Sequence, residues 1–329
     1  MSENIRVDLE AQLRDKLGRP ELRVTAVAPI PEGHSGFTYF VTVEGGEGAT
    51  RYVLRLPPPG ARIAGPADVV RQGRIMSALN AAGLPTPAIP AMSSDPVVDG
   101  RPFILMDAVN GTRVEKTVGE HKALDIVTSA VTVLKQLHAL PLDQTGIGDE
   151  ESVGLQSEMM RWAMLMQRAP EELTTRAGDL GGLLSISLPV ERAPTLVHGD
   201  FHYGNMLFRG PDVVAVLDWE IGQIGQPLLD LGCLFIAAIR NHYQHAGSAM
   251  GAIDVSVDDL YRLYGANPDE MRWFAAMSLY KYSSILGYNL MLHRKGRRPD
   301  PMYESEAMAL TIGGMIDDGM VMMTTAGGF

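Results

Sequence analysis

The sequence predicts an α+β protein of two lobes, a small N-terminal lobe with an antiparallel sheet and a larger helical C-terminal lobe. The chain has 329 residues, too long for one average domain and enough for two. Short runs rich in Val, Thr, Tyr and Phe dominate its first third, and helical apolar spacing dominates the rest. The turn signal Asn110-Gly111 lies between the strand-rich part and the helical part of the sequence. We therefore expect lobes at 1–106 and 112–329, joined by a hinge at 107–111.

The N-terminal lobe begins with a helix, because apolar residues recur at four-residue spacing over residues 4–18. Strand-like runs follow, separated by turns that contain Gly or Pro. A second helix is expected over 67–82, where Gly83 and Pro85 end the apolar pattern. The predicted strands cover 23–30, 37–43, 51–56 and 102–109.

Helices make up most of the C-terminal lobe, because apolar residues lie on one face of each segment at helical spacing. The predicted helices cover 124–138, 159–168, 228–242, 258–264, 268–293 and 303–323. Three short apolar runs interrupt them, and each fits a strand of a small sheet: 196–197, 206–208 and 213–217. The chain has no internal repeat and no low-complexity linker, so we expect the two lobes to pack into one unit.

Composition narrows the class of protein. Apolar residues make up 46% of the chain, enough for a large core, and the net charge of −11 argues against binding nucleic acid. The single cysteine, Cys233, lies in an apolar run and is expected to be a buried, inert thiol. The charged first twenty residues hold no signal-peptide core, and no apolar stretch is long enough to span a membrane. We expect a cytoplasmic protein without a membrane partner; the sequence leaves the oligomeric state open.

Polar groups converge on the segment His198-Gly-Asp-Phe-His-Tyr-Gly-Asn205 and on Asp218. Asp200 and Asn205 lie five residues apart in a loop between two predicted strands, and Asp218 ends the next strand. Loops at strand ends are where a rigid scaffold presents chemistry. A carboxylate that can take a hydroxyl proton, beside an oxygen pair that suits Mg²⁺, is what phosphoryl transfer requires.

The segment from His198 to Asn205 resembles the His-Gly-Asp-x-x-x-x-Asn signature of the aminoglycoside phosphotransferase-like kinases. Leu217-Asp-Trp-Glu220 resembles their metal-binding segment, and Asp230-Leu-Gly232 resembles the start of the helix that braces their catalytic loop. Residues 52–58 and 221–231 are most similar to kinase domains fused to acyl-CoA dehydrogenases. The resemblance implies a bilobal protein-kinase-like fold. It also implies a kinase, dependent on ATP and Mg²⁺, that passes the γ-phosphoryl group to a hydroxyl of a small molecule.

Carried over residue by residue, the resemblance makes Asp200 the base that orients the acceptor hydroxyl, and Asn205 and Asp218 the Mg²⁺ ligands. His198 would tie the loop to its surroundings. The acceptor would be an aminoglycoside-like cation, a hydroxyacyl thioester or another metabolite alcohol. In the N-terminal lobe, the residues implied to bind ATP are Ser35, Gly36, Arg55, Asp107 and Ala108.

Arg55 occupies the strand position at which such kinases usually carry a phosphate-binding lysine. The usual partner of that lysine is a glutamate on the following helix, where this sequence offers Gln72. A neutral amide can accept a hydrogen bond from Arg55 but cannot pair with its charge. We therefore expect Arg55 to be held mainly by nucleotide phosphate and to be mobile without it. Gln72→Glu is expected to improve activity by fixing the guanidinium group.

Other interpretations stay open at this point. His198, Asp200 and His202 alternate as in zinc sites, although the remaining histidines show no paired metal spacing. Arg55 and Gln72 are compatible with a catalytically silent nucleotide-binding protein. Asp230 fits a simple helix N-cap, which is compatible with a brace for the loop. Five residues on helices that would wall the cleft are expected to serve packing: Trp162, Trp273, Tyr280, Lys281 and Tyr288.

Overall fold

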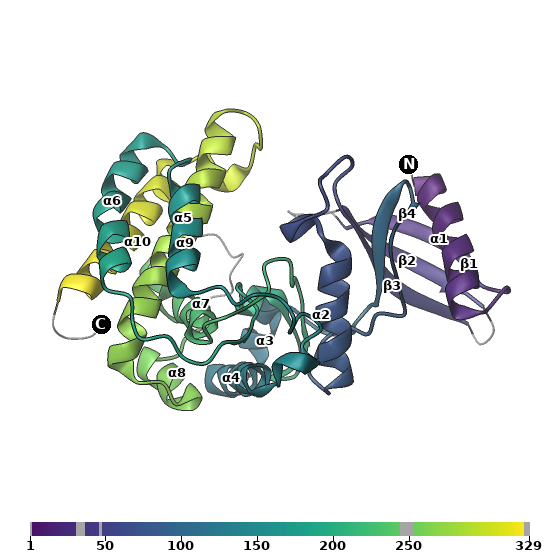
Figure 1. The fold of residues 1–329 in the computed structure, drawn as a ribbon, viewed down its shortest axis with the longest axis horizontal. Helices are drawn as coiled ribbons and strands as arrows, with labels where there is room; N and C mark the ends of the chain where they lie inside the picture. The colour runs from purple at the N-terminus through teal and green to yellow at the C-terminus, as the bar shows by residue number, and fades with distance from the viewer. Residues whose placement is uncertain (1, 31–36, 46–47, 244–252, 326–329) are drawn as a thin grey trace.

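The computed structural model describes residues 2–30, 37–45, 48–243 and 253–325, and the predicted two-lobed α+β arrangement is confirmed (Figure 1). The N-terminal lobe holds a five-stranded antiparallel sheet with the strand order β1-β2-β3-β5-β4. Its strands are β1 (Arg23–Pro29), β2 (Phe37–Glu44), β3 (Ala49–Leu56), β4 (Ala91–Val98) and β5 (Arg101–Asp107).

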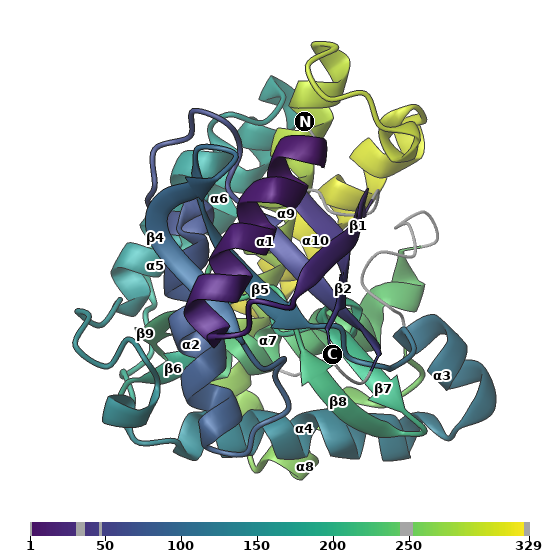
Figure 2. The same cartoon turned by 90° about the vertical axis from the view of Figure 1, so that its right-hand side faces the viewer.

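Two helices cover opposite faces of this sheet (Figures 1 and 2). Helix α1 (Ser2–Leu17) packs on the outer face through its apolar stripe, with Leu54 and Leu56 of β3 in the same core. Helix α2 (Val69–Ala81) lies between the sheet and the helical lobe. Because side chains alternate along a strand, Arg55 points away from the α1 core. It therefore faces the helical lobe.

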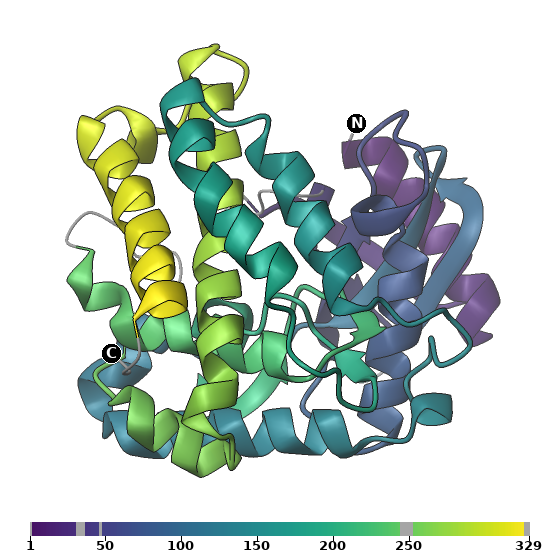
Figure 3. The same cartoon turned by 60° about the vertical axis from the view of Figure 1, so that its left-hand side comes forward.

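The helical lobe is built around α9, the middle of which is buried between its neighbours. Figure 3 shows α5, α6, α9 and α10 side by side. None of the helices in the described part of the chain is long and apolar enough to cross a bilayer. The helices are α3 (Val114–Glu120), α4 (Ala123–Ala139), α5 (Leu155–Met166), α6 (Glu171–Ile186), α7 (Leu228–Ile239), α8 (Val257–Tyr264), α9 (Pro268–Arg294) and α10 (Glu306–Thr324).

Two small two-stranded sheets pack against α3 and α4 of the helical lobe, where one small sheet was expected. Strand β6 (Thr195–Val197) pairs with β9 (Gln223–Gly225), and β7 (Met206–Arg209) pairs with β8 (Asp212–Val216). The segment that runs from β6 to β7 therefore begins beside the end of the segment that runs from β8 to β9. It ends beside the beginning of that second segment. These two segments carry the polar residues that the sequence singled out.

Helix α2 is joined to the helical lobe by three kinds of contact. Its apolar face, with Ile75 as one member, belongs to the same core cluster as the C-terminal helices. Arg71 donates to both carboxylate oxygens of Glu150 at 2.6 and 2.7 Å. The loop that contains Glu150 also approaches the helix closely, since a Cβ on Gly146 would lie 2.5 Å from the carbonyl oxygen of Arg74. The core of the N-terminal lobe on this side is thus shared with the C-terminal lobe.

Candidate active site

The loop after β6 is held in a fixed shape by His198, which is fully buried. Its Nε2–H donates to the carbonyl oxygen of Leu217 at 2.8 Å, and its Nδ1 accepts the N–H of Asp200 at 3.1 Å. Burial lowers the pKa of His198, which agrees with this neutral form of the ring. Gly199 follows with φ +81°, where a Cβ would lie 2.8 Å from the carbonyl oxygen of Ile221. Only glycine fits there without strain.

Asp230, in the first turn of α7, holds the same loop in place through hydrogen bonds. Its two carboxylate oxygens accept the N–H groups of His198 and Gly199, each at 2.8 Å. His138 of α4 lies 3.3 Å from Asp230 Oδ2 and contacts Tyr264 through its other ring nitrogen. The carboxylate is fully buried and stays stable there because these donors satisfy it. Asp230 thus braces the loop and does not act as a simple helix cap.

Asp200 projects from this loop with both carboxylate oxygens contacted. Tyr282 donates to Oδ1 at 2.6 Å, and the Lys281 ammonium lies 3.7 Å from the same oxygen. His202 Nε2 and the Asn205 amide nitrogen each lie 3.3 Å from Oδ2. Burial by itself raises the pKa of Asp200, but the neighbouring His202, Lys281 and Tyr282 outweigh it and lower the pKa well below its ordinary value. With 28% of its side chain exposed, the carboxylate is ionised and accessible.

Two of these partners come from α9 and were not predicted. Lys281 was expected to serve packing, yet its ammonium group also donates to the carbonyl oxygen of Gly199. Tyr282 drew no prediction. Both lie about 80 positions from Asp200 along the chain, and nothing in the sequence near them indicates the contact. Only the packing of α9 behind the loop brings them to the carboxylate.

Asn205 and Asp218 lie close together because Leu217 N–H donates to the carbonyl oxygen of Asn205 at 2.8 Å. Asn205 uses its amide nitrogen toward Asp200, and its Oδ1 accepts no hydrogen bond among the described residues. Asp218 has φ +64°, an uncommon value for a residue other than glycine, and its side chain is one-third exposed. A carboxylate and an amide oxygen are ligands that Mg²⁺ accepts, so the two residues fit such a site.

Arg55 of β3 reaches the same place from the N-terminal lobe, which corrects the expectation that it is mobile without nucleotide. Its guanidinium donates to Asp218 Oδ1 at 2.9 Å and to Glu220 Oε2 at 2.8 Å. Gln72 does not contact it: the amide nitrogen of Gln72 donates to the carbonyl oxygen of Pro66, and its Oε1 has no partner among the described residues. Among the described residues, the carboxylates that pair with Arg55 thus come from the segment after β8, and Glu220 is a site residue that the sequence reasoning missed.

The remaining nucleotide-site candidates are only partly visible. Ser35 and Gly36 lie outside the described residues. Asp107 ends β5, and its N–H donates to the carbonyl oxygen of Ala88, while Ala108 N–H donates to that of Arg51. Any contact of Asp107 or Ala108 with a nucleotide base therefore uses atoms other than their N–H groups.

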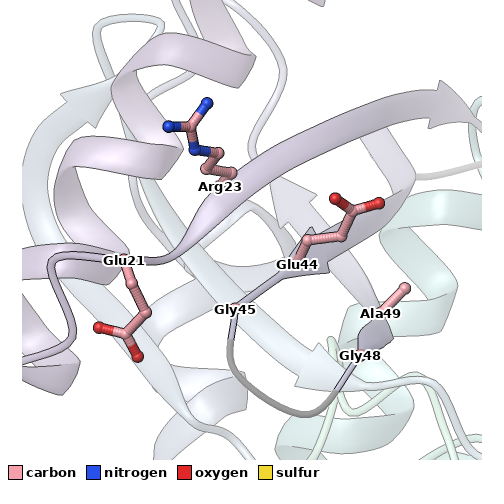
Figure 4. Close-up of a pocket in the computed structure, with 6 residues that line it drawn as sticks. All are labelled: Glu21, Arg23, Glu44, Gly45, Gly48 and Ala49. Atoms are coloured by element: carbon pink, nitrogen blue, oxygen red, sulfur yellow. The ribbon is translucent and has the colours of Figure 1, made fainter.

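The sheet also carries a shallow depression, but it lies away from Asp218. It sits at the end of the β2–β3 hairpin, where Glu44 pairs with Ala49. Arg55 is six residues further along β3, or about 20 Å at the rise of a strand. The depression has a volume of about 430 Å³ and is lined by Glu21, Arg23, Glu44, Gly45, Gly48 and Ala49 (Figure 4).

The zinc interpretation of His198, Asp200 and His202 does not fit this geometry. Both ring nitrogens of His198 are engaged with the backbone. His202 Nδ1 accepts the N–H of Gly204 at 3.1 Å, which leaves its Nε2 to face Asp200. Across the described part of the chain, no three His, Cys, Asp or Glu side chains gather as a metal site.

Comparison of the sequence with known proteins shows which family the chain resembles. A model of the phosphotransferase enzyme family matches residues 26–274, which is most of the chain. Among curated proteins, human acyl-CoA dehydrogenase family member 11 is 28% identical over 84% of this chain, and mouse member 10 is 25% identical over the same share. The chain spans 38% and 27% of the lengths of these two relatives.

Solved structures show the same fold. A Ralstonia eutropha protein, provisionally named an aminoglycoside phosphotransferase, superimposes with a TM-score of 0.72 at 22% identity, covering 95% of this chain and 98% of its own. Aminoglycoside phosphotransferase APH(4)-Ia, in a complex with ADP and hygromycin B, gives 0.62 at 15% identity, covering 97% and 100%. At these identities the likeness concerns the fold.

Proposed function

The chain belongs to the phosphotransferase enzyme family, and from this premise we propose that it is an ATP- and Mg²⁺-dependent kinase of small-molecule alcohols. One observation supports the proposal above the others. Three segments far apart in the sequence bring an ionised, accessible Asp200 together with Asn205, Asp218 and the N-terminal Arg55. This set supplies a hydroxyl acceptor, two oxygen ligands and a cation for phosphate, which are the parts that phosphoryl transfer uses.

In this proposal Asp200 accepts a hydrogen bond from the acceptor hydroxyl and so directs the hydroxyl oxygen at the γ-phosphorus. The new bond joins the hydroxyl oxygen of the acceptor to phosphorus, the bond from phosphorus to the β-phosphate oxygen breaks, and ADP leaves. The hydroxyl proton passes to Asp200. A carboxylate with a strongly lowered pKa is a weak base, so it orients the hydroxyl early and takes the proton late. That order suits a loose transition state, in which little proton transfer is needed before the phosphoryl group moves.

Asn205 Oδ1 and the Asp218 carboxylate would hold the magnesium ion, which neutralises phosphate charge when bound. Arg55 contacts one of the two Asp218 oxygens, so the metal would bind the other oxygen or displace the guanidinium group. Glu220 keeps the guanidinium group nearby while this happens. Arg55 then lies where nucleotide phosphates would meet it. We also propose that 107–111 is the hinge between the nucleotide lobe and the catalytic lobe.

For the acceptor we propose the hydroxyl group of a hydroxyacyl thioester as the first class to test. The two curated relatives, at 25% and 28% identity, carry an acyl-CoA dehydrogenase name, whereas the aminoglycoside phosphotransferase APH(4)-Ia shares the fold at 15% identity. An aminoglycoside or another metabolite alcohol is the alternative acceptor. Residues that recognise the acceptor are not part of the motif, so the choice rests on this comparison.

The deciding experiment measures ADP release from Mg·ATP with hydroxyacyl-coenzyme A thioesters, aminoglycosides and simple polyols, with mass spectrometry of each product. We expect one class to give a phosphorylated product, and Asp200→Asn to slow its formation strongly. Nucleotide binding without product from any class would instead support a catalytically silent protein. The ion pair between Arg55 and Asp218 is the observation that favours this second candidate, because it engages the proposed metal ligand.

A further inference from the structure

Lys281 links helix α9 to two consecutive residues of the Asp200 loop. Its ammonium group donates to the carbonyl oxygen of Gly199 and lies 3.7 Å from Asp200 Oδ1. The Cys233 sulfur, 3.5 Å away, is the third neighbour. The side chain is only 6% exposed. One cation thus contacts both the peptide before Asp200 and the carboxylate itself.

The other buried carboxylates nearby take their hydrogen bonds from groups other than Lys281. Glu158 accepts the indole N–H of Trp162 at 2.6 Å and the Gln223 amide at 2.9 Å. Asp230 accepts two backbone N–H groups, as described above. Neither carboxylate makes a hydrogen bond or an ion pair with Lys281 in the described structure. Its direct polar contacts with oxygen atoms are therefore those to Gly199 and Asp200, while Glu158 and Asp230 act on its charge from a longer distance and raise the pKa of Lys281.

Nor is Lys281 placed to contact a substrate. The rings of Trp162 and Tyr282 lie 5.3 and 4.8 Å from its ammonium nitrogen. The cavity that it lines behind the loop measures about 10 Å³, room for one water molecule at most. A small molecule that reaches Asp200 must come from its other, exposed side. Lys281 supports the carboxylate from behind.

A buried ammonium group is costly to desolvate, and a neutral side chain would fill this space more cheaply. Its presence is explained if the charge fixes one arrangement of the loop. We propose that Lys281 is a positioning residue that clamps the Gly199 carbonyl and the Asp200 carboxylate, and so sets the direction in which Asp200 meets the acceptor hydroxyl. This inference rests on the proposed kinase function.

The test compares Lys281→Met, Lys281→Arg and the matched control Ser283→Ala. Ser283 is fully buried on the same helix, and its hydroxyl has no hydrogen-bond partner among the described residues. Three quantities are measured: turnover with the acceptor found above, affinity for Mg·AMP-PNP, and hydrogen–deuterium exchange of the peptide covering 198–205. For Lys281→Met we expect turnover to fall about a hundred-fold, which is the effect of a misplacement of about 1 Å.

Nucleotide affinity should stay unchanged in Lys281→Met, and exchange in 198–205 should rise. Lys281→Arg should recover part of the turnover because it keeps the charge, and Ser283→Ala should match the natural protein. Turnover and exchange in Lys281→Met equal to those of Ser283→Ala overturn the inference. So does equal loss in the Met and Arg variants, because packing alone then explains it.

Two further outcomes can be told apart from these. If Lys281→Met does not fold, Lys281→Gln replaces it. An exchange rate of 198–205 in Lys281→Gln that equals the rate in Lys281→Arg then contradicts a role for the charge. If the natural protein transfers phosphate to no acceptor, the proposed function fails. The exchange of 198–205 then decides the positioning role alone, and unchanged exchange in the neutral variant rejects it.

Discussion

Arg55 of the N-terminal sheet donates to Asp218 Oδ1 at 2.9 Å, across the space between the two lobes. A residue proposed to bind phosphate is thus paired with a residue proposed to bind metal. When both ligands arrive together as Mg·ATP, each partner exchanges one charged neighbour for another. The pair keeps both charges compensated before the nucleotide binds, and the energy of this contact must be replaced when it does.

Arg55→Ala should weaken binding of Mg·ATP by about ten- to a hundred-fold, because a charge-assisted contact with phosphate is lost. Isothermal titration with AMP-PNP measures this. Arg51→Ala is the control, since Arg51 lies on the same strand but stacks over Phe40 at 3.7 Å and should leave affinity unchanged. An unchanged affinity in Arg55→Ala would mean that another residue holds the phosphates.

Gln72→Glu should destabilise the protein and leave its turnover no higher, contrary to the expectation from the sequence. Gln72 is only 1% exposed, and its Oε1 has no partner among the described residues, so a carboxylate there would be buried without compensation. The unfolding free energy should fall by about 1–3 kcal/mol or more. Gln72→Leu, which removes the unpaired oxygen, should lose less. Thermal unfolding of both variants checks the order, and a Glu variant that is more stable or more active refutes it.

Asp200→Asn should lower turnover by about a hundred- to ten-thousand-fold, while nucleotide affinity stays almost unchanged. The amide keeps the size of the side chain but cannot accept the hydroxyl proton. Asp212→Asn, at the first residue of β8, is the matched control. Steady-state kinetics and a nucleotide titration separate the two effects, and a variant that keeps most of its activity would remove Asp200 from its assigned role.

His198 should make stability depend on pH below neutrality. Burial lowers its pKa in the folded protein, whereas the unfolded chain binds a proton near the ordinary pKa of about 6.5. Its stabilising contribution is therefore complete above that pH and is lost as the pH falls. One such proton changes the unfolding free energy by about 1.4 kcal/mol per pH unit. Denaturant titrations at several pH values between 7 and 5 give the unfolding free energy as a function of pH. This free energy should fall less with decreasing pH in His198→Gln than in the exposed-site control His121→Gln. An equal pH dependence in the two variants contradicts the assignment.

Cys233 should resist alkylation in the native protein. Burial raises its pKa to about 11, so the thiolate that reacts is scarce at pH 8. Iodoacetamide should label the sulfur only after denaturation, as followed by intact mass. Rapid, complete labelling of folded protein would show that α7 opens readily at this position.

The sequence predicted the Asp200 loop because its polar residues follow one another locally, and it predicted α1 from a regular apolar spacing. It missed β4, an edge strand that contains Pro96 and exposed polar residues, a pattern that only edge strands tolerate. It missed α6, whose three glycines weaken the helical signal. Contacts such as Glu220 with Arg55 and Tyr282 with Asp200 join distant segments, and packing alone decides them.

The position of α2 has a consequence for how this chain folds and for how it can be divided. Residues 1–106 end next to the proposed hinge, yet a fragment cut there would expose the apolar face of α2, where Ile75, Met76 and Leu79 are now buried in the larger core. It would also leave Arg71 without Glu150. Such a fragment should be prone to aggregation. We therefore expect that the N-terminal lobe does not fold stably by itself, and that the two lobes depend on each other to reach their folded state.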